Sequence, residues 1–425
     1  MESPLRVQDR IDGSREFITM ANQQGSFLTA IDVGSAKTCA LMAEMTDTGL
    51  RYRGHGVAES RGSRKGVIVE LDKAVASIQK AVEAAEDVAG APVENAIIGI
   101  GGAHVRGINT HGGISLGTRP RDIGRDEIKQ AVERARAVPL PADREILHLL
   151  PQEFILDDQA GIHDPLGMMA ARIEVRVHMV TAATSATQNV ITAVNKAGVH
   201  VDDTVFEPLA AADSVLRSDE RELGVCLADI GAGSTELVVF QQGAVAWTGV
   251  IPVGGDHFTS DLSVGLCAPL AEAEKIKKNF GNAIVTLIPE GNEVEVPQVG
   301  DRPSRLMPQR LVAEILEPRA RELFEMMRDT LRQSGMFDIC IAGVVLTGGA
   351  SRLPGLFDVA ESVLRRSVRL SWPMPLAKMP STLSEPEFAT VLGMVNYGQR
   401  ARIARGFQEG GLGSRLKAML VGKGA

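Results

Sequence analysis

Two copies of one short motif constrain the fold of this chain more than any other feature. Residues 224–241 read GVCLADIGAGSTELVVFQ, and residues 28–42 read LTAIDVGSAKTCALM. In each copy a turn with an acidic residue and glycine separates two apolar runs rich in strand-forming residues, which predicts a β-hairpin. Aligning Asp32 with Asp229 also aligns a glycine and a threonine that follow each of them. The repetition predicts an internal duplication and therefore two similar lobes.

The second copy has the chemistry of a phosphate-binding turn. Gly231 and Gly233 carry no side chain, so their backbone N–H groups can close around an anion. Ser234 and Thr235 add hydroxyl donors, and Asp229 can hold a hydrated divalent cation. For one copy alone, a hairpin in which the glycines serve only the turn is an equal alternative. Two such hairpins facing each other across a cleft would hold one polyphosphate from both sides.

A third glycine motif occurs near the end of the chain. Gly348 and Gly349 follow the strand-like residues 344–346 in GVVLTGGASRLPG, and they would let a nucleoside lie against bare backbone. Three such elements in this order resemble the actin-type ATPase superfamily, which also contains sugar kinases and the DnaK-type chaperones. A Rossmann or P-loop fold fits poorly, because neither hairpin has the glycine spacing of those folds.

Length and composition exclude several classes of protein. At 425 residues the chain is long enough for two or more domains. A net charge of −8 argues against a nucleic-acid-binding protein, because such a surface needs a basic excess. The 4 cysteines are scattered among apolar residues, so we expect reduced core thiols and no disulfide or metal framework. No apolar run reaches the ~18 residues of a membrane span, and the N-terminus lacks the apolar core of a signal peptide, so we expect the bulk of the chain in the cytosol.

Hydrophobic periodicity predicts the other elements. Residues 1–26 are polar without sustained periodicity, which predicts a disordered leader. Apolar residues at helical spacing predict a helix over 70–90 and a long helix over 308–335, which Pro318 should kink or divide. Residues 103–180 exceed what a duplicated lobe requires. Their mixed helical and alternating patterns predict a small inserted α/β subdomain.

Several segments between residues 27 and 420 resemble the bacterial cell-division family FtsA. They include FLTAIDVGSAKT, FEPLAAADSVL, ADIGAGSTELVVF, IPVGGDHFTSDLS and GVVLTGGASRLPGL. LPQEFILD in the insertion and ILEPR in the long helix are not shared by actin-type proteins generally. The resemblance implies an α/β, actin-like, two-lobed fold with duplicated RNase H-like lobes and an inserted subdomain called 1C.

The same resemblance implies a division of the chain. Subdomain 1A would comprise residues 27–102, 181–218 and 372–398, subdomain 1C residues 103–180, subdomain 2A residues 219–257 and 334–371, and subdomain 2B residues 258–333. A linker over 399–411 and an amphipathic membrane-targeting tail over 412–425 would follow.

ATP and magnesium are the implied cofactors, and the resemblance assigns residues to them. Asp32 and Asp229 would face the magnesium ion through water. The phosphates would lie between Gly34, Ser35, Lys37 and Thr38 on one side and Gly231, Gly233, Ser234 and Thr235 on the other, with Glu274 and Lys277 at the adenosine and Gly348 and Gly349 under the adenine. The residues alone leave two alternatives open: a solvent-facing Lys37, and a solvated ion pair between Glu274 and Lys277.

Glu207 is the candidate for orienting an attacking water, because FEPLAAA is similar to the segment that carries such a glutamate in DnaK-type chaperones. Phosphoryl transfer depends mostly on positioning and charge neutralisation, so one carboxylate near the γ-phosphate could suffice. The alternative is a glutamate that only stabilises the N-terminus of the following helix. We therefore expect ATP hydrolysis to be slow or absent, with ATP chiefly holding the lobes closed.

The implied function is that of a polymerising cell-division protein. It would assemble head to tail, bind the C-terminal tail of the tubulin-like protein FtsZ on subdomain 2B, and attach it to the cytoplasmic face of the inner membrane at the division site. Other division proteins would be partners, and nucleic acid would not. Arg305, Arg310 and Arg319 are the candidate FtsZ-binding residues, with a solvated charged face as the alternative. An actin-fold sugar kinase is the alternative function, but we can assign neither its Asp base nor its sugar pocket.

Residues 412–421, LGSRLKAMLV, predict a helix that binds a membrane surface. The apolar residues Leu412, Leu416, Met419 and Leu420 fall at i, i+4, i+7 and i+8, and Arg415, Lys417 and Lys423 supply positive charge for anionic lipid. A frayed tail with chance spacing is the alternative. Because the gain from apolar burial is close to the cost of ordering the segment, one tail should bind weakly. A filament that carries many tails should bind far better.

Overall fold

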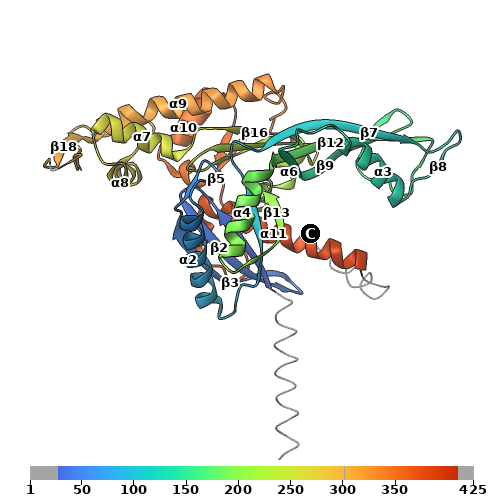
Figure 1. The fold of residues 1–425 in the computed structure, drawn as a ribbon. Coiled ribbons are helices and arrows are strands. Elements are labelled where there is room, and N and C mark those ends of the chain that lie inside the picture. Colours follow the sequence, from blue (N-terminus) through green and yellow to red (C-terminus); the bar gives the residue numbers. More distant parts are fainter. Residues whose placement is uncertain (1–26, 301, 410–425) are drawn as a thin grey trace, which may run out of the picture.

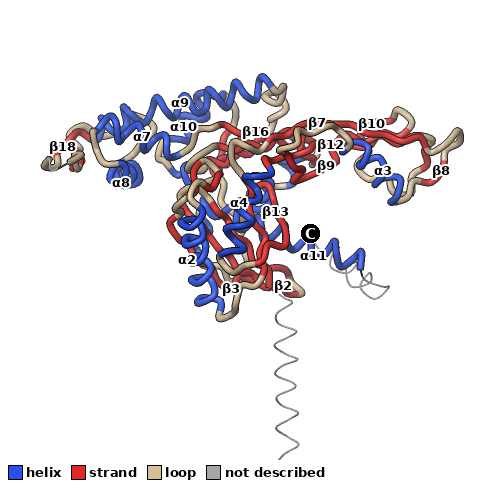
Figure 2. The backbone as a smooth tube through the Cα atoms, viewed as in Figure 1, coloured by secondary structure: helices blue, strands red, loops and turns tan. Residues whose placement is uncertain are grey.

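The computed structural model describes residues 27–300 and 302–409. Figure 1 shows two lobes and a third, elongated part that projects to one side, and Figure 2 shows that each part combines strands with helices. The predicted leader over 1–26 and the predicted tail over 412–425, with Leu412, Leu416, Met419 and Leu420, lie outside the described residues. Among the described helices, none combines the length and apolar character that a membrane span requires.

The first lobe is built on a five-stranded sheet with two parallel and two antiparallel pairs. Its strands, in spatial order, are β13 (His200–Phe206), β6 (Asn95–Ile100), β1 (Phe27–Val33), β2 (Lys37–Thr46) and β3 (Gly49–Glu59). The short pair β4 (Ser63–Arg64) and β5 (Val67–Ile68) follows β3. Residues of β1 are buried almost continuously, because helices cover both faces of the sheet.

Alternation along the strands divides the first-lobe core into two layers. Ile31, Ala40 and Met42 pack with α2 (Leu71–Ala89) and α4 (Thr184–Lys196). Ala30 and Leu41 face the other way and pack with α11 (Ala389–Glu409). Helix α5 (Glu207–Val215) begins directly after β13 and packs against α11. The helix predicted over 70–90 is α2.

The second lobe repeats this sheet with the same connectivity. Its order is β16 (Ala244–Ile251), β15 (Thr235–Gln241), β14 (Val225–Ile230), β19 (Val344–Thr347) and β20 (Val368–Leu370). The hairpin β14–β15 corresponds to β1–β2, and both later strands pair in parallel as in the first lobe. The predicted duplication is therefore present in the fold.

Helices and short elements complete the second lobe. They are α6 (Ser218–Leu223), α7 (Gly255–Leu266), α8 (Leu270–Phe280), α9 (Gln309–Gln333), α10 (Leu356–Leu364), the hairpin β17 (Glu293–Val296) and β18 (Arg305–Pro308), and the 3₁₀ turns η2 (Val285–Leu287) and η3 (Gly349–Arg352). Helix α9 runs without a break through Pro318, so this proline does not begin a new segment. Buried Leu316 and Ala320 hold the helix on both sides of it.

The inserted part is a separate small α/β domain. It has a four-stranded sheet of β10 (Gln159–Ile162), β9 (Arg144–Leu156), β12 (Arg172–Ala183) and β7 (Arg106–Ser115), the short pair β8 (Arg121–Asp122) and β11 (Met169–Ala170), and the helix α3 (Arg125–Arg136). Helix α3 packs on β7 and β12, which forms the domain's own core. Figure 1 shows this domain alongside β16 of the second lobe.

The final helix is longer than the sequence suggested. The 3₁₀ turns η4 (Ser381–Ser384) and η5 (Pro386–Phe388) lead into α11, which continues to Glu409. Residues 399–409 of the predicted linker 399–411 are therefore helical. Arg, Gln and Ala, which dominate QRARIARGFQE, are good helix formers and can extend a helix that packing has already started.

Candidate nucleotide site

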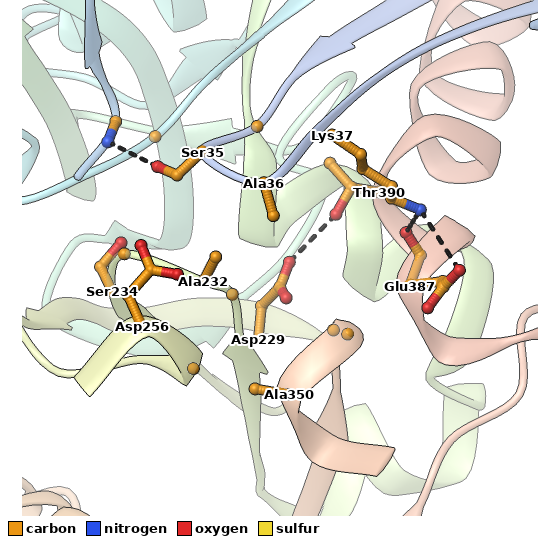
Figure 3. Close-up of a pocket in the computed structure, with 18 of the residues that line it drawn as sticks. Ser35, Ala36, Lys37, Asp229, Ala232, Ser234, Asp256, Ala350, Glu387 and Thr390 are labelled. Atoms are coloured by element: carbon orange, nitrogen blue, oxygen red, sulfur yellow. Dashed lines mark hydrogen bonds and ion pairs between the residues drawn. The ribbon is translucent and has the colours of Figure 1, made fainter. Parts of the chain in front are cut away.

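A cavity of about 650 Å³ lies between the two lobes and collects most of the residues that the sequence singled out. The turn after β1 and the turn after β14 line it from opposite sides, as Figure 3 shows for Ser35 and Ala36 above and Ala232 and Ser234 below. The third glycine motif and residues of α7 and α8 complete the wall. Of the predicted site residues, those of both turns except the threonines line this one space.

The turn between β14 and β15 is fixed by backbone hydrogen bonds. Gly231 donates its N–H to the carbonyl of Ser234 at 3.0 Å, which closes the turn. At the start of α7, Gly255 donates to the carbonyl of Gly231 and Asp256 to that of Ala232, both at 2.9 Å. A Cβ atom on Gly231 would lie 3.3 Å from the Ser234 oxygen, so a side chain fits here only tightly.

Gly233 allows the two lobes to approach each other. A Cβ atom at this position would lie 2.7 Å from the Cα atom of Lys65 and 3.0 Å from the hydroxyl of Ser35, both in the first lobe. Ser35 in turn accepts a hydrogen bond from the N–H of Gly66 at 3.3 Å. The absence of a side chain at Gly233 therefore serves the contact between lobes, a role that the sequence argument did not include.

Asp32 and Asp229 enter the cavity from equivalent strands. Burial raises the pKa of Asp32 to about 6, with Lys37 opposing and Asp229 adding to the shift. Burial also raises the pKa of Asp229, whose carboxylate accepts a hydrogen bond from the Thr390 hydroxyl at 3.0 Å. A buried carboxylate and a partly buried one that lack full compensation suit a magnesium ion that keeps most of its water and is also held by phosphate oxygens. The donor set therefore fits the implied metal.

Lys37 lines the cavity but its ammonium group points away from the turn. The Nζ atom donates to the carbonyl of Glu387 at 2.6 Å and lies 3.5 Å from the centre of the Phe388 ring. Burial lowers the pKa of Lys37, while Asp32 and other anionic neighbours oppose this shift. Lys37 is thus neither a solvent-facing lysine nor, in this structure, directed at the space between the turns.

Thr38 and Thr235 do not line the cavity. The Thr38 hydroxyl pairs with that of Ser60 at 2.8 Å, and the Thr235 hydroxyl donates to the carbonyl of Val253 at 2.8 Å. Each threonine lies opposite the residue that follows the motif aspartate, so alternation directs it to the other face of the sheet. The prediction that these two hydroxyls face phosphate treated strand residues as turn residues.

Gly348 lies against the carboxylate of Asp229. Its φ of +84° is in the left-handed region, and a Cβ atom here would lie 2.3 Å from the Asp229 Oδ1 atom. Gly349 begins η3 and also lines the cavity. Gly348 therefore leaves room for the Asp229 carboxylate, and both glycines present bare backbone to the cavity.

Glu274 and Lys277 form an ion pair that is also part of the cavity wall. Their side chains approach to 2.6 Å on α8. Lys277 further donates to the carbonyl of Gly255 at 2.9 Å and to the hydroxyl of Thr259 at 2.8 Å, which ties α8 to α7. The two interpretations that the sequence left open, ion pair and ligand contact, are compatible.

Glu207 lies in the cavity wall at the first position of α5. A Cβ atom on Gly99 would lie 2.8 Å from its Cγ atom, so a glycine of β6 makes room for this side chain. Burial, and then the neighbouring carboxylates of Glu236, Asp32 and Asp229, raises the pKa of Glu207 well above its ordinary value. Its position at a helix N-terminus and its place in the cavity are both real features of the structure.

Sequence reasoning missed several polar residues of the cavity, namely His104, Glu236, Asp256, Arg352, Glu387 and Thr390. One of them could have been found. The hairpin register pairs Glu236 with Asp229, so both side chains lie on one face of the sheet. Glu387 and Thr390 come from a segment more than 140 residues after the β14–β15 hairpin, and no local pattern connects them to it.

The three candidate FtsZ-binding arginines lie outside the cavity, on the far part of the second lobe. Arg305 is exposed on β18, and Arg310 pairs with Glu314 at 3.3 Å on α9. Arg319 makes two hydrogen bonds to Asp261, at 2.6 and 3.0 Å, which tie α9 to α7. The three side chains are therefore not equally available to a partner.

Two family models match this chain. The model described as "Cell division protein FtsA" matches residues 226–393, and the model described as "SHS2 domain inserted in FTSA" matches residues 102–181. The curated relatives include Cell division protein FtsA of Pseudomonas aeruginosa, 41% identical over 377 residues, which are 88% of this chain and 90% of the relative. Cell division protein FtsA of Neisseria meningitidis is 36% identical over 376 residues, with 88% and 90% covered.

Solved structures share the fold at low sequence identity. The PilM–PilN type IV pilus biogenesis complex gives a TM-score of 0.63 at 17% identity, covering 87% of this chain and 98% of the other. MreB5 of Spiroplasma citri bound to ADP gives 0.54 at 11% identity, covering 91% and 99%. The MamK double helical filament gives 0.50 at 11%, covering 88% and 98%. The predicted actin-like fold with an inserted domain is confirmed.

The buried carboxyl of Glu236 makes stability depend on pH in a defined direction. Burial, and then Asp229, raises its pKa from an ordinary 4.5 to about 8, so the folded state keeps a proton that the unfolded state releases above about pH 4.5. This contribution to stability is complete below pH 4.5 and is lost as the pH rises through 8. Glu236→Gln removes the titration. In the nucleotide-free protein its unfolding midpoint should therefore rise relative to wild type between pH 5 and pH 9.

The matched control is Glu325→Gln on the exposed face of α9. Its difference from wild type should be the same at pH 5, 7 and 9 when thermal unfolding is followed by circular dichroism. A pH-independent difference for Glu236→Gln would contradict the assignment of a protonated carboxyl at this site.

Proposed function

Because this chain belongs to the FtsA family of cell division proteins, we propose that it is a nucleotide-dependent, polymerising adaptor that links FtsZ to the inner face of the membrane. In this proposal ATP and magnesium occupy the cleft, the chain assembles with its own copies, and its last residues hold the assembly on the bilayer at the division site. Membership in this family also removes the reason for considering a sugar kinase.

The observation that carries the proposal is the cavity between two equivalent Asp–Gly hairpins. Backbone groups of Gly34 and Gly231 and the hydroxyls of Ser35 and Ser234 line it from both sides. Asp32 and Asp229 would hold the magnesium ion. MreB5, which shares the fold, is described with bound ADP, and this supports a nucleotide as the ligand. A ligand that contacts both lobes stabilises their closed arrangement.

ATP hydrolysis in this cleft would depend on positioning. Glu207 would orient the attacking water, while magnesium would offset the charge of the phosphates. Lys37, the lysine of the first turn, is directed at Glu387 and Phe388 and not at the space between the turns. We therefore expect slow turnover, with ATP acting mainly as a structural ligand.

Self-association is supported by a structural relative. MamK, which shares the fold, is described as a double helical filament. In the proposal, copies of this chain join head to tail, so each filament presents many C-terminal segments to one surface. Weak binding by one segment then becomes strong binding by the assembly, because each later contact is effectively intramolecular.

The β17–β18 hairpin and the start of α9 offer a surface for the FtsZ tail. Leu306 on β18 is 69% exposed and lies next to the exposed Arg305. An exposed apolar side chain beside positive charge suits a short peptide with apolar and acidic residues. Arg310 can contribute, whereas Arg319 is engaged by Asp261 and is expected to act on the fold of this region.

Gly231→Val tests the cleft. The added branched side chain would crowd the Ser234 oxygen and occupy the phosphate space, so ATP affinity should fall about tenfold or more. Titration with a fluorescent ATP analogue in the presence of magnesium measures this. Ala142→Val introduces the same valine side chain at an exposed position that does not line the cavity, and it should leave the affinity unchanged. Native affinity in a folded Gly231→Val protein would place the nucleotide elsewhere.

Charge reversal tests the FtsZ surface. The double variant Arg305→Glu and Arg310→Glu should weaken binding of an FtsZ tail peptide about tenfold, because it replaces attraction with repulsion at an exposed surface. Lys129→Glu with Arg134→Glu on α3 makes the same change in net charge on the inserted domain, and should not alter the affinity measured by fluorescence anisotropy. Equal binding by both double variants would remove this surface from the proposal.

Leu416→Glu tests the membrane anchor, which lies outside the described residues. A charge in the middle of the apolar stripe should release the protein from vesicles that contain anionic lipid, while ATP binding persists. Sedimentation with liposomes and ATP, which reports polymerisation and membrane binding together, is the measurement. Lys417→Arg keeps the charge and should co-sediment like wild type. Co-sedimentation of Leu416→Glu at the wild-type level would show that this segment is not the anchor.

A further inference from the structure

Glu236 is a buried carboxyl in a strand that is otherwise apolar on the same face. Only 5% of the residue is exposed, and Val238 and Phe240, which follow it at alternate positions of β15, belong to the core. Burying an ionisable group costs free energy unless it is hydrogen-bonded or paired. A glutamate at this position therefore needs a specific partner.

The partner belongs to the other lobe. The N–H of Gly102, which lies between β6 and the inserted domain, donates a hydrogen bond to the Oε1 atom of Glu236. Glu236 comes from the second lobe, so this hydrogen bond crosses the cleft beside the cavity that both residues line. It links the β14–β15 hairpin, which contains Asp229, to a glycine turn of the first lobe.

Glu207 and Glu236 converge on a single glycine. A Cβ atom built on Gly101 would lie 2.3 Å from the Glu207 Oε2 atom and 2.8 Å from the Glu236 Oε1 atom. The absence of a side chain at Gly101 is therefore what lets two carboxyl groups from different lobes meet. Because this position lies in the cavity wall, the pair borders the space that a nucleotide would use.

The duplicated hairpin shows that this carboxyl is not a general requirement of the fold. In the first lobe the residue opposite Asp32 is Cys39, which is buried in the core. The equivalent residue opposite Asp229 is Glu236. The position opposite the motif aspartate can thus hold a small apolar side chain. It holds a carboxyl group only in the second lobe, where the side chain lies near Glu207.

We infer that Glu236 is a positioning residue for ATP hydrolysis, which acts by holding the Gly101–Gly102 turn and Glu207 in place across the closed cleft. This inference rests on the proposed binding of ATP. In the reaction the oxygen of water bonds to the γ-phosphorus, the bond from that phosphorus to the bridging oxygen breaks, ADP leaves with that oxygen, and both protons of the water stay on the released phosphate. Glu207 orients the water, and Glu236 fixes Glu207 and the turn beside it.

The test compares Glu236→Ala with Glu236→Gln in the full chain. Alanine removes the acceptor for the Gly102 N–H, whereas the glutamine oxygen can still accept it. We expect phosphate release from the alanine variant to fall about tenfold or more, while its affinity for a fluorescent ATP analogue changes less than about threefold. Glutamine should restore phosphate release to within about threefold of wild type. Cys39→Ala, at the matched position of the other hairpin, should leave the rate unchanged.

Hydrogen exchange gives a second and direct measurement. The peptide that contains Gly102 should exchange about tenfold faster in the alanine variant with ATP bound, and at the wild-type rate in the glutamine variant. Wild-type phosphate release by Glu236→Ala, no rescue by glutamine, or ATP binding without any phosphate release by the wild-type protein would each overturn the inference. Failure of the wild-type protein to bind ATP would instead contradict the proposed function on which the inference rests.

Discussion

The two lobes meet around buried negative charge, and the cleft depends on how that charge is held. Asp32, Glu207, Asp229 and Glu236 all line one cavity, and burial raises the pKa of each. Ionised carboxylates repel each other strongly where water is excluded. Bound phosphates would add to this charge, so the cleft can close on a nucleotide only if a cation or protonated carboxyls compensate. A bound magnesium ion and the protonation of carboxyl groups with raised pKa values would both reduce the net negative charge in the cleft.

The fold could be predicted from the sequence because the duplicated hairpin can be recognised in short segments, and its repetition implies two lobes with matching sheets. Matching motifs gave matching sheets, and the surplus of residues 103–180 appeared as an inserted domain. Side-chain direction was harder. Thr38 and Thr235 carry suitable hydroxyls, but Thr38 already belongs to β2 and Thr235 to β15, and the strand alternation directs both hydroxyls away from the cavity. A shift of one residue in where a strand begins reverses the face to which each side chain points, and the sequence defines this boundary poorly.

The rest of the site depends on distant segments that no motif identifies. Lys37 looked like a phosphate ligand, yet the carbonyl of Glu387 and the ring of Phe388, about 350 residues away in the sequence, decide where its ammonium lies. The motif glycines were correctly predicted to allow another group to approach the backbone closely. The expected group was the nucleotide, whereas in the structure protein atoms lie against these glycines. Gly233 makes room for Lys65, and Gly348 makes room for Asp229. An absent side chain can be recognised in a sequence, while the atom that takes its place cannot.

These contacts also join the cleft to the inserted domain. The turn that donates from Gly102 leads directly into β7, and the N–H of Phe206, in β13 of the first lobe, donates to the Nε2 atom of His148 in β9 at 2.9 Å. On its other side the domain is held by the second lobe, where the buried His178 ring pairs with the hydroxyl of Thr248 at 2.9 Å. The domain is thus attached to both lobes by hydrogen bonds as well as by the chain. Any change in the angle between the lobes must break one set of these contacts or turn the domain with it.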